Sequence, residues 1–205
     1  MGLPKCMIDI DGQTILSRLI HLLRPHVPRI HVVIGYREEI IAEYCARHFR
    51  DVVLVRNPDF RTTNTSHSLR LGSIGLHDKI LYLDGDLLID EESMSGFISR
   101  ATQVPILVGI THAKSSQAVF AITHETSEGL LEIVSFDRDR PSPFEWGNVF
   151  VGPPAILKPG TGYVFESLAD HLPIPAHELQ LFEVDTTADL QRAQEGIACI
   201  NTRND

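Results

Sequence analysis

Two aspartates separated by one glycine follow a short apolar run near the middle of the sequence. Ile80–Leu83 has the composition of a buried strand, and Asp84-Gly85-Asp86 comes directly after it. Carboxylates at the end of a buried strand are costly unless something uses them. Asp84 and Asp86 lie on one side of an extended segment, and hard oxygen ligands of this kind suit Mg²⁺. The alternative is an Asp-Gly turn with one helix-capping aspartate.

The segments before this pair alternate between helical and extended patterns. Apolar residues recur at helical spacing from Ile15 to Leu23 and again from Arg37 to Phe49. His31–Gly35 and Asp51–Arg56 read as buried strands. Strand, helix and strand at this spacing indicate βαβ units. The predicted fold class is therefore α/β, a Rossmann-like and mostly parallel sheet flanked by helices.

The pattern changes after a predicted strand over Val104–Ile110. Ala118–Thr123 and Leu130–Phe136 read as antiparallel strands, and a loop is expected to end in Phe144–Asn148. Tyr163–Leu172 has a helical pattern, and Leu181–Asp185 reads as a strand that ends in an aspartate. We expect a single domain over residues 1–205, with a small antiparallel lobe at roughly 112–160.

Composition excludes several classes of protein. The 205 residues carry a net charge of −9, which argues against a nucleic-acid-binding surface. Cys6, Cys45 and Cys199 are odd in number and show no C-x-x-C spacing, so we expect a reduced, cytoplasmic location and no zinc site. No apolar run approaches the length of a membrane span, and we expect no membrane partner.

Several short motifs together resemble the nucleoside-triphosphate transferase family, whose members join a nucleotide to a sugar 1-phosphate, phosphocholine or a similar phosphorylated small molecule. The motifs are Pro4-Lys5 with Ile10-Asp11-Gly12, Val33-Ile34-Gly35-Tyr36, Asn57-Pro58-Asp59-Phe60 with Thr63-Asn64 and Ser68-Leu69, Asp84-Gly85-Asp86, and Phe182-Glu183-Val184-Asp185-Thr186 with Asp189-Leu190. The segment from Asn57 to Leu69 looks most like the branch that contains phosphocholine cytidylyltransferases. The family's N-terminal Gly-rich G-x-G-x-R loop, which wraps the triphosphate, has no counterpart before Pro4-Lys5, so we expect weak NTP binding by this sequence.

The resemblance implies roles for the charged residues of these motifs. Asp86 and Asp185 would hold one Mg²⁺ between two strand ends, with helix capping as the alternative. Lys5 would be the catalytic residue, contacting the phosphates and stabilising the charge that develops on the α-phosphoryl oxygens; its alternative is an ordinary surface lysine.

The resemblance also implies residues that bind the two substrates. Lys5, Asn64, Ser68 and Asp84 would contact the nucleotide, although Asn64 and Ser68 could instead serve local capping of a helix. Glu145 and Trp146 fall in the acceptor region of the lobe and could recognise a cationic head group, or the tryptophan could simply be packed. The expected partners are an NTP and a phosphorylated small-molecule acceptor, and homo-oligomer formation is left open.

Three functions from different classes fit the sequence. The first is a Mg²⁺-dependent nucleotidyltransferase that releases pyrophosphate. The second is a nucleotide-sugar glycosyltransferase, because Asp84-Gly85-Asp86 also fits a D-x-D metal site. The third is a nucleotide-binding protein without catalytic activity.

Overall fold

The computed structural model describes residues 2–114, 118–160, 162–184 and 189 of the chain. By contact density the chain divides into two compact units. The first consists of the described residues of Met1–Thr62, Gly85–Glu91 and Leu181–Asp205, and the second of those of Thr63–Asp84 and Glu92–Gln180. The expected single domain with a lobe at 112–160 stays a prediction.

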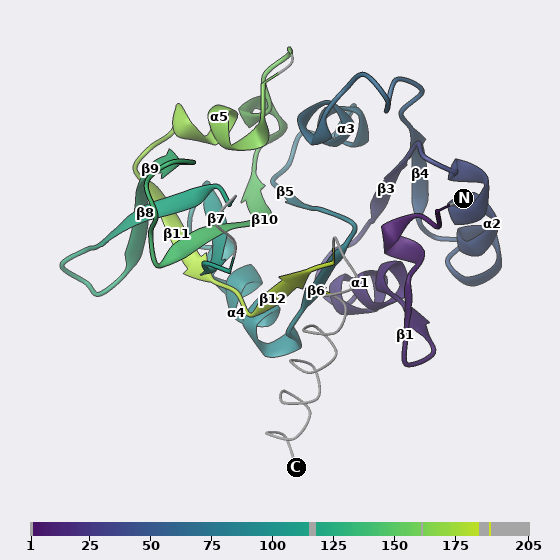
Figure 1. Cartoon of the computed structure of the whole chain (residues 1–205), viewed down its shortest axis with the longest axis horizontal. Coiled ribbons are helices and arrows are strands. Elements are labelled where there is room, and N and C mark those ends of the chain that lie inside the picture. The colour runs from purple at the N-terminus through teal and green to yellow at the C-terminus, as the bar shows by residue number, and fades with distance from the viewer. Residues whose placement is uncertain (1, 115–117, 161, 185–188, 190–205) are drawn as a thin grey trace. The chain divides into compact units, whose positions relative to one another are not determined.

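The first unit combines short strand pairs with two helices. Its elements are η1 (Lys5–Met7), β1 (Asp9–Ile10), β2 (Gln13–Thr14), α1 (Ile15–Leu23), β3 (His31–Ile34), α2 (Glu38–His48), β4 (Val53–Arg56), β6 (Leu87–Ile89) and β12 (Leu181–Glu183). β1 and β2 form a hairpin, and β12 pairs antiparallel with β6. β3 and β4 are parallel, and Figure 1 shows them side by side with α2 next to β4.

Both helices of this unit follow from their sequences. At the start of α1 the backbone N–H of Ser17 donates to the Thr14 hydroxyl oxygen at 3.1 Å, which satisfies one of the free donors of the first turn. The apolar residues that recur at helical spacing in α1 are buried: Ile15, Leu16, Leu19, Ile20 and Leu23. α2 carries acidic residues in its first turn and basic residues in its last, the arrangement that the helix dipole favours.

The second unit is built on one large sheet. Its elements are α3 (Thr65–Gly72), β5 (Ile80–Leu83), α4 (Glu91–Ala101), β7 (Leu107–His112), β8 (Phe120–Glu125), β9 (Leu131–Asp137), β10 (Phe144–Gly152), η2 (Pro154–Ile156), α5 (Val164–Ala169) and β11 (Ile174–Glu178). The strand order is β5-β10-β7-β11-β9-β8, and β8 also pairs with the beginning of β10. Figure 1 shows the strands of this sheet with α5 beside β9.

The α/β class is confirmed, but the prediction of a mostly parallel sheet is wrong for the described residues. Only β3–β4 and β11–β7 are parallel pairs among the described strands; the other pairings are antiparallel. The cause is β10, which inserts between β5 and β7 and runs antiparallel to both. The sequence had suggested that Phe144–Asn148 ends a loop, whereas these residues open β10.

The prediction of two antiparallel strands after Val104–Ile110 is confirmed. The two predicted antiparallel strands are β8 and β9, which pair with each other in that sense. The core of this unit contains Val108 and Ile110 from β7, Phe150 from β10 and Leu168 from α5, each at most 1% exposed. Among the described residues, no helix is both long enough and apolar enough to cross a membrane.

Candidate nucleotide and metal site

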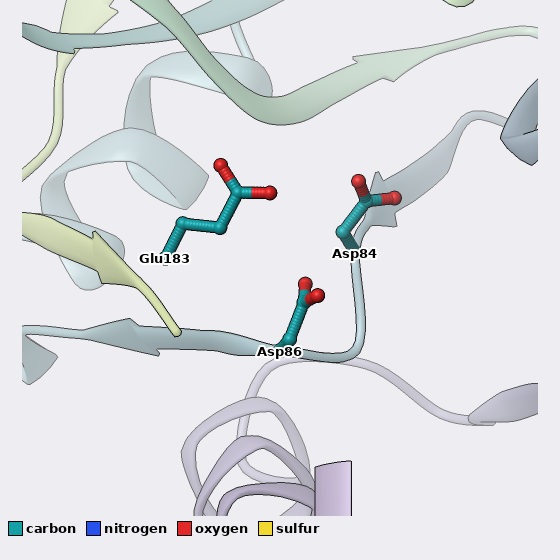
Figure 2. Close-up of side chains that lie close together, drawn as sticks. All are labelled: Asp84, Asp86 and Glu183. Carbon is teal, nitrogen blue, oxygen red and sulfur yellow. The ribbon is translucent and has the colours of Figure 1, made fainter. Parts of the chain in front are cut away.

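Three carboxylates come together where β5, β6 and β12 end or begin. Asp84 follows β5, Asp86 precedes β6, and Glu183 is the last residue of β12. One carboxylate oxygen from each lies within 4.8 Å of the others. Figure 2 shows the three side chains near one another. Asp84 and Asp86 are half-buried, and Glu183 is exposed. We call these three residues the acidic cluster.

The strand ladder holds two members of the cluster in register. β12 pairs with β6 so that Glu183 lies opposite Leu87, and the backbone N–H of Val184 donates to the Asp86 carbonyl oxygen at 3.0 Å. Glu183 therefore comes beside Asp86 because of a pairing between segments almost one hundred residues apart in the sequence.

Asp84 is held from its other side by β10. Leu83 pairs with Val149, and the backbone N–H of Asp84 donates to the carbonyl oxygen of Asn148 at 3.3 Å. This bond continues the β5–β10 ladder by one residue past the end of β5. The backbone of Asp84 is thus fixed where its carboxylate joins the acidic cluster.

Lys5 supplies a cation to the acidic cluster. Its ammonium nitrogen lies 3.3 Å from Oδ2 of Asp86, and the side chains of Lys5 and Asp86 are 47% and 18% exposed. The two residues are 81 positions apart in the sequence. The structure therefore brings together Lys5 and Asp86, which the resemblance had assigned to phosphate binding and metal binding.

The donor set of the cluster fits a hard divalent cation. Carboxylate oxygens are the ligands that Mg²⁺ takes from proteins, usually one or two of them, with substrate phosphates completing the shell. Oxygen ligands of one octahedral Mg²⁺ lie about 3.0 Å apart when adjacent and about 4.2 Å apart when opposite, so three carboxylate oxygens that lie within 4.8 Å of one another would draw closer together around a bound ion.

Asp185, the second predicted metal ligand, lies outside the described residues, and its role stays a prediction. Sequence reasoning missed Glu183 although it belongs to the same motif, Phe182-Glu183-Val184-Asp185. Residues two apart in a strand point to the same side. The alternation of a predicted strand therefore made Glu183 a candidate metal ligand for the same reason as Asp185.

Two of the four residues predicted to contact the nucleotide, Asn64 and Ser68, lie at the start of α3. Oδ1 of Asn64 accepts from the backbone N–H of His67 at 3.3 Å, which is the N-cap of the helix. Its Nδ2 donates to the carbonyl oxygen of Gly162 at 2.8 Å. Ser68 is half-buried within α3. The capping alternative is therefore present for Asn64, and contact of Asn64 and Ser68 with a nucleotide stays a prediction.

Glu145 and Trp146, the predicted acceptor-binding pair, are neighbours on β10. The Glu145 carboxylate accepts from the backbone N–H of Lys114 at 3.1 Å, while Trp146 packs against the core of its unit. The indole nitrogen of Trp146 is buried and has no hydrogen-bond partner within the described part of the chain. Adjacent strand residues point to opposite faces, so one ligand does not meet both side chains on the same face. Their acceptor role stays a prediction.

A half-buried thiol lies beside the Asp-Gly-Asp segment. The Cβ atom of Cys6 would lie 3.8 Å from a Cβ placed on Gly85. Burial raises the pKa of the Cys6 thiol to about 11, and the negative charge of Asp86 adds to the shift. Cys6 is therefore a neutral neighbour of the acidic cluster and not a nucleophile at physiological pH.

The raised pKa predicts slow alkylation of Cys6. Only about 0.1% of a thiol of pKa 11 is ionised at pH 8, and the thiolate is the reactive form. Iodoacetamide at pH 8 should label Cys6 in the folded protein about 100-fold more slowly than in urea, with the rate rising about tenfold per pH unit. Mass spectrometry of the Cys6 peptide measures both rates. Equal rates in the folded and unfolded chain would contradict the shift.

Part of the sequence is similar to curated proteins. A stretch of 88 residues is 28% identical to the bifunctional protein GlmU of Methanococcus maripaludis strain C5 / ATCC BAA-1333, covering 43% of this chain and 21% of that protein. The chain is also 22% identical to the CMP-5'-(3-aminopropyl)phosphonate synthase of Streptomyces rubellomurinus, over 93% of this chain and 35% of the relative. The chain spans about a fifth to a third of the length of these two relatives.

Solved structures share the fold at low identity. A UDP-glucose pyrophosphorylase complexed with UDP-glucose superposes with a TM-score of 0.78 at 14% identity, covering 96% of this chain and 90% of that chain. The inositol-1-phosphate CTP transferase from T. maritima gives a TM-score of 0.75 at 17% identity, with 97% and 87% covered. HddC from Yersinia pseudotuberculosis gives 0.72 at 16% identity, with 95% and 90% covered.

These likenesses establish the α/β nucleotidyltransferase fold. The family model described as the MobA-like NTP transferase domain matches residues 1–146, which is most of the chain. The protein therefore belongs to the MobA-like NTP transferase family.

Proposed function

We propose that this protein is a Mg²⁺-dependent nucleotidyltransferase that joins an NTP to a phosphorylated small molecule and releases pyrophosphate. The observation that carries the proposal is the Lys5 ammonium 3.3 Å from Asp86 within a trio of carboxylates. A cation next to a hard-metal donor set is the combination that polyphosphate chemistry needs, because both reactants are anions.

The proposed reaction exchanges one phosphoanhydride bond for another. An oxygen of the acceptor's phosphate attacks the α-phosphorus of the NTP, and the bond to the oxygen that bridges the α- and β-phosphorus atoms breaks. Pyrophosphate leaves with that oxygen. The nucleophile is already an anion, so no general base is required. Catalysis then consists of positioning and of neutralising charge on the phosphate oxygens.

The described residues would divide these tasks. Asp84, Asp86 and Glu183 would hold Mg²⁺, with Asp185 as the further ligand that the family resemblance suggests. When bound, Mg²⁺ would supply positive charge to the phosphate oxygens. Lys5 would turn from Asp86 toward the α-phosphoryl oxygens and stabilise the charge that develops there.

The acceptor would lie along the beginning of β10. β10 continues beyond the point where its pairing with β5 ends. Glu145 precedes Asn148 by three residues, so at the usual rise of a strand it lies roughly 10 Å farther along β10. Three of the similar proteins carry names that contain inositol-1-phosphate, UDP-glucose and an aminopropylphosphonate. We infer that the acceptor is likewise a small phosphate or phosphonate, and that the Glu145 carboxylate favours one with a cationic group.

Pyrophosphate release tests the proposal directly. The protein is incubated with Mg²⁺, each of the four NTPs in turn, and a panel of glucose 1-phosphate, inositol 1-phosphate, phosphocholine and 3-aminopropylphosphonate. Pyrophosphate is measured enzymatically, and ³¹P NMR identifies the product. Release that needs both substrates and stops with EDTA supports the proposal. NTP binding without pyrophosphate release across the panel would favour the nucleotide-binding alternative.

The same assay separates the glycosyltransferase alternative, which the convergence of Asp84 and Asp86 also fits. A glycosyltransferase uses a nucleotide sugar as the donor and releases a nucleoside diphosphate. Turnover of UDP-glucose with release of UDP, and no pyrophosphate from any NTP, would replace the proposed reaction with this one.

A further inference from the structure

β10 contains a bulge next to the acidic cluster. Against β7, Trp146 pairs with Ile110 and Val149 pairs with Gly109, so the register of the two strands shifts between Trp146 and Val149. At Asn148 the backbone is left-handed, with φ of 55°. This conformation is uncommon for a residue with a side chain, and Asn is among the few types that tolerate it. Bulges of this kind are enriched next to active sites.

β10 pairs with β7 both before and after the bulge, but its second neighbouring strand changes there. Before it, Phe144 and Glu145 pair with β8; after it, Val149–Gly152 pair with β5. The carbonyl group of Asn148 accepts the backbone N–H of Asp84 at 3.3 Å. The left-handed residue is therefore the one whose backbone meets the first carboxylate-bearing residue of the acidic cluster.

We propose that Asn148 is a positioning residue: its left-handed backbone holds Asp84 in place for binding of the divalent cation. The proposal rests on the metal site of the proposed function and adds the residue that orients it. A β-branched or bulky residue at this position would push the backbone toward the extended region. The carbonyl group would then turn away from Asp84, and the cluster would lose part of its geometry.

Substitutions at Asn148 separate the backbone from the side chain. Glycine adopts left-handed backbone freely, whereas alanine does not. The affinity for Mn²⁺, titrated by electron paramagnetic resonance as a stand-in for Mg²⁺, is the readout and needs no turnover. We expect Asn148→Ala to bind Mn²⁺ about 10- to 100-fold more weakly, the usual effect of losing a group that orients a metal ligand. Asn148→Gly should bind within about twofold of the unaltered protein.

Asp11 offers a matched control for backbone strain. It has φ of 53° in the turn between β1 and β2, where it is exposed. Asp11→Ala should lower the melting temperature as Asn148→Ala does, because both place alanine in the same region of backbone space. It should leave the Mn²⁺ affinity unchanged. Asn148→Ser, which likewise lacks the tolerance of asparagine for left-handed backbone, replaces Asn148→Ala in the titration if the latter does not fold.

The outcomes are distinct. Equal weakening by Asn148→Gly and Asn148→Ala would overturn the proposal, because the side chain would then be what matters. Unchanged Mn²⁺ affinity in a folded Asn148→Ala or Asn148→Ser protein would also overturn it, while leaving the metal site of the proposed function intact. If the unaltered protein bound no Mn²⁺, both the metal site and the role of Asn148 would be wrong.

Discussion

Replacing Asp86 with asparagine is expected to lower nucleotidyl transfer by about 100-fold or more while the protein stays folded. Asparagine has nearly the same shape as aspartate but no charge, so the acidic cluster loses a ligand suited to Mg²⁺. The Lys5 side chain, whose ammonium group loses this carboxylate, is 47% exposed, so water can solvate the charge and the effect on stability stays small. Pyrophosphate release at limiting Mg²⁺, together with the melting temperature, measures both effects.

Asp51→Asn is the control for Asp86→Asn. Asp51 makes an exposed ion pair with Arg24 at 2.7 Å in the same unit, and its side chain is 65% exposed. Loss of an exposed pair has little effect on stability, and we expect turnover at the level of the unaltered protein. Near-normal turnover of Asp86→Asn at limiting Mg²⁺ would remove Asp86 from the metal site.

Replacing Lys5 with alanine is expected to reduce kcat/KM by about 100- to 1,000-fold, equivalent to roughly 2.7–4 kcal/mol of transition-state stabilisation. The cause is the loss of the cation that stands 3.3 Å from Asp86. The affinity for Mn²⁺ should change in the opposite direction or not at all, because a positive charge next to the cluster repels a bound cation. Steady-state kinetics and a metal titration on the same preparation separate the two effects.

Lys158→Ala is the matched control for Lys5→Ala. Lys158 forms an ion pair with Asp170, and its side chain is 60% exposed, similar to Lys5. Its removal should leave kcat/KM unchanged. A loss smaller than about threefold for Lys5→Ala would return Lys5 to the class of ordinary surface lysines. Weaker Mn²⁺ binding by Lys5→Ala would show that the residue supports the metal site and not the phosphates.

The position of Asp84-Gly85-Asp86 at the end of an apolar strand was predictable from local sequence. An apolar run that stops at Asp84-Gly85-Asp86 can end only where water or a ligand meets the carboxylates, because burying them alone is too costly. The family resemblance assigned Lys5 to the phosphates and Asp86 to the metal, and the Lys5 ammonium nitrogen lies 3.3 Å from Oδ2 of Asp86. Helix α1 was also predictable, because its apolar spacing is a local pattern.

The choice of strand partners was decided by the tertiary structure. Alternating helices and strands predicted a mostly parallel sheet, but β10 enters between β5 and β7 and reverses the direction of both pairings. Which strand inserts beside which depends on the packing of side chains far apart in the sequence, and hydrophobic periodicity contains no such information.

The pairing of strands far apart in the sequence also determines which polar residues surround the acidic cluster. Glu183 reaches it through the pairing of β12 with β6, and Asn148 through a bulge that only the register of β10 creates. Asn64 caps α3 and donates a hydrogen bond to the carbonyl oxygen of Gly162. Its sequence motif alone did not show whether it would make such contacts or bind a nucleotide. Residue types and short spacings determine which chemistry is available to the chain. The long-range register of the strands determines which of those residues meet, because a hydrogen-bonded ladder positions both of its strands at once.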